Sequence, residues 1–155
     1  MQQHNWQQPL RGDWTVQLNE AVLAAPAPVV LVAHSLGCIL TAWWARHAPP
    51  AVVGKVQAAL LVAPGDVEQA DLRQHLPGWA PIARQRLPFA AVVVGSQNDP
   101  YCRLARAQQL AADWGAQWVD AGAAGHINSA SQLGDWPQGH ALLQDLVKDS
   151  VHGKR

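Results

Sequence analysis

Three polar residues of this 155-residue chain are of the types that together activate a serine hydroxyl. Ser35 lies in V-A-H-S-L-G-C, Asp99 in G-S-Q-N-D-P and His126 in A-G-H-I-N. A serine hydroxyl is a weak nucleophile at neutral pH until a base takes its proton, and a histidine oriented by a carboxylate is a common base. We therefore predict Ser35 as a nucleophile, His126 as its general base and Asp99 as the acid that orients the imidazole.

The hydrophobic pattern predicts that each of these residues follows a buried strand. Short apolar runs with many β-branched residues alternate with segments of helical periodicity, which favours an α/β fold in which helices flank a parallel sheet in three layers. The carboxyl ends of parallel strands meet at one edge of the sheet, so the three residues would meet there. The predicted strands are 28–33, 56–63, 89–95 and 116–120, and the predicted helices are 11–24, 37–47, 101–114 and 137–151, with one further short helix at 67–75.

The turn around Ser35 has small residues where a strained strand-to-helix turn needs them. Ala33 and Gly37 stand two positions before and two positions after the serine. The usual nucleophile elbow has glycine at both positions, and alanine is the smallest departure from it. The backbone N–H of Leu36, at the start of the following helix, is predicted to bind the oxyanion.

Alternative interpretations stay open for each residue. Ser35 could be an ordinary helix cap. Asp66, after the second strand, is a rival for the acid, and Asp120 is a weaker one. His34, beside the serine, is interpreted as the variable residue of the elbow rather than as the base.

Composition excludes several classes of function. Lys+Arg and Asp+Glu are 11 each, and no basic stripe predicts binding to nucleic acid. No apolar run reaches the roughly 18 residues of a membrane span, and the polar start of the chain is no signal peptide, so we predict a cytoplasmic protein without membrane contact. Cys38 and Cys102 fit no metal spacing and are expected to be free thiols.

We expect one domain over residues 1–155, because this length is typical of a single domain. Residues 64–88 are too long for a plain connection and are predicted to form a lid or pocket wall. Within and just after this segment, Trp79 and Phe89 are the expected apolar substrate contacts.

The combination of motifs resembles the small serine hydrolases of the α/β-hydrolase superfamily, the group related to retinoblastoma-binding protein 9. The pieces that carry the resemblance are V-L-V-A-H-S-L-G-C, L-L-V-A-P, L-P-F-A-A-V-V-V-G-S-Q-N-D-P-Y-C and G-H-I-N-S-A-S-Q-L-G-D-W-P-Q-G, and with their connecting helices they cover nearly the whole chain from Arg11. The resemblance implies a nucleophile at Ser35, an acid at Asp99 and a base at His126, with no metal and no organic cofactor.

The resemblance also predicts that one unit is missing. Members of this family begin with a central strand and a His-Gly loop that supplies a second oxyanion N–H, and neither is found before residue 10. About 30 family residues are therefore expected to be absent. The strand P-V-V-L-V would then have an exposed edge, and self-association is a known hazard of such edges. Residues 1–8 would be loose, or the sheet would pair in an unusual way, or another chain would fill the gap.

From these observations we predict a serine hydrolase that cleaves a small ester, thioester or amide through an acyl-enzyme, impaired if the missing unit is truly absent. The alternative is a hydrolase-fold binding or interaction protein with weak or no turnover. The loss of one oxyanion donor favours that alternative, because such a loss lowers turnover about 10²–10³-fold.

Overall fold

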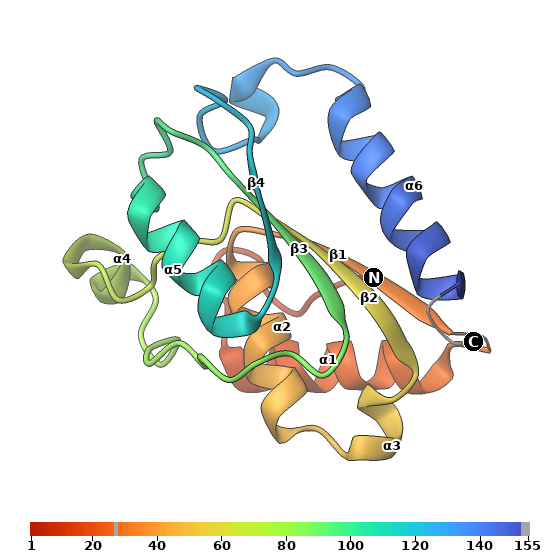
Figure 1. Ribbon diagram of the computed structural model, residues 1–155. Coiled ribbons are helices and arrows are strands. Elements are labelled where there is room, and N and C mark those ends of the chain that lie inside the picture. Colours follow the sequence, from red (N-terminus) through yellow and green to blue (C-terminus); the bar gives the residue numbers. More distant parts are fainter. Residues whose placement is uncertain (27, 153–155) are drawn as a thin grey trace.

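The sheet has four parallel strands in the order of the chain. The computed structural model describes residues 1–26 and 28–152. All three strand pairs are parallel, as the alternation of strands and helices predicts. The strands are β1 (Val29–His34), β2 (Val56–Val62), β3 (Ala90–Gly95) and β4 (Gln117–Asp120) (Figure 1).

The helices follow the predicted order, with one addition. The short helix α3 starts at Pro50, because proline has no N–H to lose in the first turn of a helix. None of the described helices is both long and apolar enough to span a membrane. The helices are α1 (Arg11–Ala24), α2 (Leu36–His47), α3 (Pro50–Val53), α4 (Ala70–His75), α5 (Leu104–Trp114) and α6 (Pro137–His152), and a 3₁₀ turn, η1, spans Ser129–Ser131.

Alternate residues of the strands divide the core into two apolar layers. Leu61 and Val93 face α1, α2, α3 and α5 on one side of the sheet, with the large side chains of Trp44 and Trp114. Residues of the opposite parity face α6, which lies apart from the other helices in Figure 1, and Leu146 supplies the contact from that helix. This arrangement is the predicted three-layer α/β fold.

Strand β1 lies at the outer edge of the described sheet. It pairs only with β2 among the strands that the structure describes. The side chain of Val32 in its middle is 60% exposed. The free edge that the sequence predicts at P-V-V-L-V is therefore present.

The N-terminal segment is held on α1 rather than loose. The indole N–H of Trp14 donates a hydrogen bond to the carbonyl of His4 at 2.7 Å, and the side-chain amide of Gln3 donates to the carbonyl of Trp14 at 3.3 Å. The ring of Trp6 packs edge-on against that of Trp14. Residues 1–8 are therefore anchored by the first turn of the first helix.

Candidate active site

Ser35 occupies the sharp turn between β1 and α2. Its backbone has φ 53° and ψ −115°, a conformation that costs a residue with a Cβ about 1–3 kcal/mol. The turn is held by a hydrogen bond from the Ser35 N–H to the carbonyl of Val62 at 2.9 Å. Although Ser35 stands at the N-cap position of α2, its side chain makes no capping bond. Its hydroxyl is therefore free to point elsewhere, which argues against the cap interpretation.

The structure brings the three predicted residues together. The Oγ of Ser35 lies 2.8 Å from Nε2 of His126, and Nδ1 of the same ring lies 2.9 and 3.0 Å from the two carboxylate oxygens of Asp99. The side chain of Asp99 is only 3% exposed, and that of His126 is 9% exposed. Because a carboxylate only accepts hydrogen bonds, Nδ1 donates to it, which leaves Nε2 as the acceptor for the serine hydroxyl.

The rival acids have other partners. Asp66 is buried and pairs with the guanidinium of Arg106 at 3.3 Å. Asp120 is exposed and accepts hydrogen bonds from the Gln97 side chain and the Gly122 N–H, and these bonds lower its pKa. Of the three aspartates, Asp99 is the one that contacts His126.

Two polar residues that the sequence analysis missed tie the Asp99 loop to the His126 loop. The Ser96 hydroxyl accepts a hydrogen bond from the N–H of Ala124 at 2.9 Å, and the side-chain oxygen of Asn98 accepts one from the N–H of Gly125 at 2.7 Å. The Ser96 hydroxyl in turn donates to Asn98. These bonds fix the spacing of two loops from different strands. The polar run S-Q-N-D directly after β3 was their only signal in the sequence.

Tyr101 completes the surroundings of the Asp99–His126 pair. Its backbone N–H donates to the Asp99 carboxylate at 2.9 Å. Its ring packs edge-on against the imidazole, with 4.6 Å between the ring centroids. The Asp99 carboxylate therefore accepts from a backbone N–H as well as from the imidazole. The imidazole of His126 contacts the Tyr101 ring as well as the carboxylate.

Small residues keep space around the serine. A Cβ on Gly37 would stand 3.4 Å from that of Ala33, so positions 33 and 37 face each other across the turn, and the side chains there must stay small. A Cβ on Gly65 would stand 3.4 Å from Oγ of Ser35. Gly65, directly after the second strand, was not singled out from the sequence, and it leaves the hydroxyl approachable from that side.

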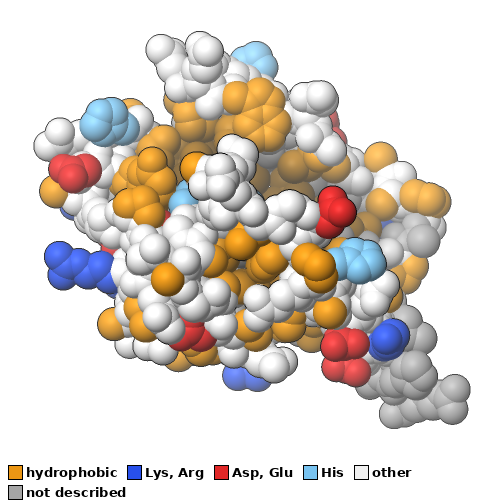
Figure 2. Space-filling model, turned by 90° about the horizontal axis from the view of Figure 1, so that it is seen from above, with side chains coloured by type: hydrophobic (Ala, Val, Ile, Leu, Met, Phe, Trp, Pro, Cys, Tyr) orange, Lys and Arg blue, Asp and Glu red, His pale blue; other side chains and the backbone are white. Residues whose placement is uncertain are grey.

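A small cavity opens beside the hydroxyl, and we call it the Ser35 pocket. It has a volume of ≈ 280 Å³. Seen from above, the molecule is hollowed between groups of hydrophobic side chains (Figure 2). The N–H of Leu36 belongs to the first residue of α2, where N–H groups have no carbonyl partner inside the helix. The pocket is lined by Ser35, Leu36, Gly65, Val67, Leu72, Leu76, Tyr101, His126 and Asn128.

The structure does not place Trp79 and Phe89 at the Ser35 pocket. Trp79 is fully buried in the core, edge-on to Trp14, and its indole N–H donates to the carbonyl of Pro9. Phe89 lines a cavity at the amino end of β3, together with Pro88 and Val56. Segment 64–88 leaves the sheet at the carboxyl end of β2 and returns at the amino end of β3. Only its first part can therefore border Ser35, and Val67, Leu72 and Leu76 do so.

His34 contacts the base through its backbone. Its Nε2 lies 2.8 Å from the carbonyl oxygen of His126 and donates to it, and the two ring centroids are 4.7 Å apart. Partial burial lowers the pKa of His34, and the nearby His126 ring acts in the same direction, while the bond to the carbonyl opposes this. His34 is thus more than a variable residue of the turn, because it supports the loop that carries His126.

Comparisons with solved structures support this fold. A YdeN-like hydrolase from Pectobacterium atrosepticum superposes with a TM-score of 0.81 at 24% identity, covering 97% of this chain and 76% of that one. The ydeN gene product from B. subtilis superposes with a TM-score of 0.76 at 18% identity, covering 96% and 81% of the two chains. A carboxylesterase of Bacillus cereus is more distant, with a TM-score of 0.51 at 17% identity, over 81% of this chain and 60% of that one. At these identities the likeness shows a shared fold. A comparison with curated proteins found no match.

The family is shown by a match over most of the chain. The profile of the serine hydrolase family, described as "Serine hydrolase", matches residues 1–145, a range that contains β1 to β4 and also Ser35, Asp99 and His126. The closer kinship with retinoblastoma-binding protein 9 stays a prediction. The chain belongs to the serine hydrolase family and has the α/β-hydrolase fold.

Proposed function

We propose that this protein hydrolyses a small ester, thioester or amide through an acyl-enzyme formed on Ser35. The observation that carries the proposal is the unbroken hydrogen-bonded chain from Asp99 through His126 to Ser35. Its members come from three separate strand ends, and the serine sits in a strained backbone conformation. Strain that the surrounding fold maintains at a polar, reactive residue supports a functional role.

The proposed chemistry runs in two halves. As Oγ of Ser35 attacks the acyl carbon, its proton passes to Nε2 of His126, which then gives it to the leaving alcohol, thiol or amine. Water next attacks the acyl-enzyme and gives its proton to His126, which returns it to the serine as the acid product departs. Asp99 holds the imidazole with Nε2 toward the serine and stabilises the imidazolium in both halves.

The negative charge on the acyl oxygen needs donors at the site. The backbone N–H of Leu36, at the positive end of the α2 dipole, is the donor that we assign. The volume of the Ser35 pocket, ≈ 280 Å³, lies just below the range of about 300–1,000 Å³ typical of ligand pockets. Its apolar wall of Val67, Leu72 and Leu76 suits a short hydrocarbon group, so we propose a small acyl substrate.

A fluorophosphonate probe tests the proposal. It should label Ser35 covalently in the folded wild-type protein and leave a Ser35→Ala variant unlabelled. p-Nitrophenyl acetate should give a burst of p-nitrophenol that the same variant loses. If the folded wild-type protein were neither labelled nor acylated, the proposed nucleophile would be wrong.

The second candidate is a binding protein of the same fold with weak or no turnover. The feature that favours it is the oxyanion site. Among the described residues, the donor that we assign to this site is the backbone N–H of Leu36. Removal of one donor from an oxyanion hole typically lowers turnover about 10²–10³-fold. In that case Ser35 would still react with the fluorophosphonate, whereas steady-state hydrolysis after the burst would be undetectable.

The cytoplasmic location stays a prediction.

A further inference from the structure

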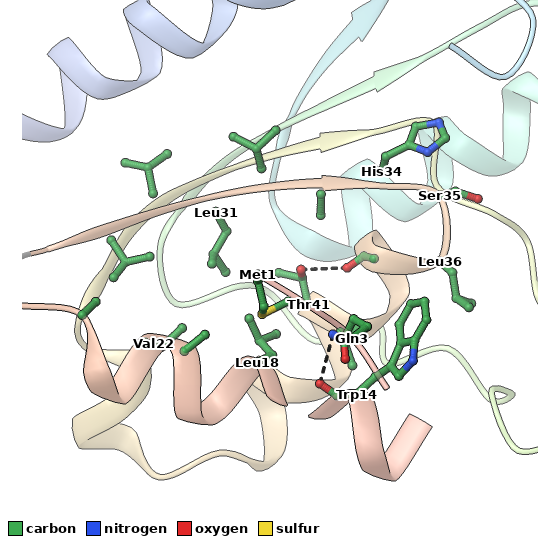
Figure 3. A pocket seen from close by; sticks show the side chains of 18 of the residues that line it. Met1, Gln3, Trp14, Leu18, Val22, Leu31, His34, Ser35, Leu36 and Thr41 are labelled. Carbon is green, nitrogen blue, oxygen red and sulfur yellow. Dashed lines mark hydrogen bonds between the residues drawn. The ribbon is translucent and has the colours of Figure 1, made fainter. Parts of the chain in front are cut away.

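The side chain that precedes the nucleophile in the sequence is bonded to the backbone of the proposed base. Nε2 of His34 donates to the carbonyl oxygen of His126 at 2.8 Å, and Nε2 of His126 accepts from the hydroxyl of Ser35, also at 2.8 Å. Figure 3 shows His34 and Ser35 in succession at the carboxyl end of β1, with the His34 ring on one side of the strand and Leu36 on the other. Because His34 and Ser35 share a peptide bond, the two hydrogen bonds close a ring of contacts between this turn and the loop that carries His126.

The backbone around His126 is strained. Gly125 has φ 58° and Ile127 has φ 48°, so a left-handed residue stands on each side of the base. This conformation is costly for a β-branched residue such as isoleucine, and such strain persists only where the surrounding structure maintains it. The position of the imidazole therefore depends on contacts that other elements make with this loop.

Hydrogen bonds from two directions hold the loop. On its amino-terminal side, Ser96 and Asn98 accept from the two backbone N–H groups that precede His126. On its carboxyl-terminal side, the peptide group between His126 and Ile127 accepts from His34. No other side chain of the described residues is hydrogen-bonded to the backbone of His126 or Ile127. Without the bond from His34, that peptide group loses its hydrogen-bonded tie to β1.

The bond from His34 does not depend on the charge of its ring. A carbonyl oxygen only accepts, so Nε2 carries the proton in the neutral ring, and it keeps that proton when the ring is charged. The two imidazoles also contact each other, with 4.7 Å between the ring centroids of His34 and His126. His34 therefore has two ways to hold the base, a hydrogen bond to its backbone and a contact with its ring.

We propose that His34 is a positioning residue for the reaction, and that its hydrogen bond to the carbonyl of His126 keeps the base within reach of Oγ of Ser35. This inference rests on the proposed function, because it assigns a part in the same acyl transfer. A general base must lie within hydrogen-bonding distance of the proton that it takes, and a misplacement of 1 Å can lower a rate about 10²-fold. His34 does not line the Ser35 pocket, so we expect it to act on the rate and not on substrate binding.

Two substitutions separate the hydrogen bond from the ring contact. His34→Phe keeps a flat ring beside His126 but has no donor, whereas His34→Gln has no ring but can still donate from its amide to the carbonyl. The measurements are kcat and KM for p-nitrophenyl acetate and the rate of labelling by a fluorophosphonate. For the phenylalanine variant we expect kcat and the labelling rate to fall about tenfold, with KM changed less than about twofold. The glutamine variant should keep most of the wild-type rate.

His47→Leu is the matched control. His47 stands at the end of α2 opposite to Ser35, and its Nδ1 is bonded to the carbonyl of Trp43 at 2.8 Å, so this variant loses a bond of the same kind away from the pocket. Its kcat and labelling rate should equal those of the wild type. Circular dichroism checks that each variant is folded. If His34→Phe does not fold, His34→Leu takes its place, because it puts a smaller apolar side chain at an exposed position.

The outcomes distinguish this inference from the proposed function. If the wild type is labelled and the folded phenylalanine or leucine variant reacts equally fast, the proposed function stands and the positioning role is wrong. Equal losses in the phenylalanine and glutamine variants would contradict a role for the hydrogen bond, and a raised KM at unchanged kcat would assign His34 to substrate binding instead. If the wild type is neither labelled nor acylated, the proposed function is wrong, and so is the positioning role.

Discussion

At the carboxyl end of β1, polar groups are paired with one another, whereas along the outer edge of the same strand they are not. The hydroxyl of Ser35, the imidazole of His126 and the carboxylate of Asp99 form one hydrogen-bonded chain. A few residues earlier, the outward backbone groups of β1 face an apolar cavity, and the Oε1 of Gln3 across from them has no partner. Full pairing suits a site that must hold a fixed geometry. A buried acceptor without a donor instead lowers stability and fixes no geometry.

The two regions also store free energy differently. In the Ser35 pocket the cost lies in the backbone, at the positive φ of Ser35. Beside β1 it lies in the buried Oε1 of Gln3, which has no donor among the described residues. The comparison therefore predicts that changes at the pocket alter activity most, and that changes at Gln3 alter stability with little effect on activity.

The largest effect is expected for Asp99→Asn. Asparagine keeps the shape of the side chain but can donate as well as accept, so the imidazole loses the partner that fixes its tautomer, and kcat should fall by about 10⁴. Asp66→Asn is the matched control, because Asp66 is the rival acid and pairs with Arg106 instead. Steady-state hydrolysis of p-nitrophenyl acetate measures both variants. A larger loss for Asp66→Asn than for Asp99→Asn would reverse the assignment of the acid.

Substituting Ser35 itself separates activity from strain. Ser35→Gly and Ser35→Ala should both lose hydrolysis, but only glycine relieves the conformation at φ 53°. The relief of about 1–3 kcal/mol is partly offset by the greater freedom of glycine in the unfolded chain, so a net gain of about 1 kcal/mol is expected. Urea unfolding measures the free energy of unfolding of each variant. Equal stabilities would show that the strain at Ser35 does not exceed the entropic cost of glycine, about 0.5–1 kcal/mol.

Beside β1, Gln3→Leu should stabilise the protein without changing its activity. The variant removes a buried acceptor that has no partner, and it gives up one long hydrogen bond of 3.3 Å to Trp14. The net gain should be about 1 kcal/mol. Thermal unfolding measures it, with Gln3→Glu as the control, which should destabilise because it buries a charge. A destabilised leucine variant would mean that the acceptor is satisfied in solution.

The smallest effect is expected where the two regions meet, at His34. Its folded-state pKa lies below its unfolded value, so the unfolded chain binds a proton more readily. The corresponding stability is present above the unfolded pKa of about 6.5 and is lost as the pH falls below it. His34→Gln should reduce the loss of stability between pH 8 and pH 5.5, while its amide can still donate to the carbonyl of His126. Denaturant unfolding at both pH values tests this, and an unchanged pH dependence would contradict it.

Local pattern was enough to predict the order of elements and the identities of Ser35, Asp99 and His126. Periodicity of apolar residues marks strands and helices, and the rule that parallel strands end at one edge brings three distant motifs together. The exclusion of Asp66 as the acid needed the structure, because both aspartates follow strands and only the fold shows that Asp66 pairs with Arg106 while Asp99 contacts His126.

Other features were decided by tertiary structure alone. Trp79 was predicted at the pocket from its position in the chain. In the structure it is buried in the core, where its indole N–H donates to the carbonyl of Pro9, some 70 residues away in sequence. Gly65 and Asn98 border or brace the site through contacts with other loops, which leave no period in the sequence. The spacing of residues along one strand or helix is a local property, and it can be seen directly in the sequence. Which side chains from different elements meet depends on how the layers pack, and that appears only when the whole chain is folded.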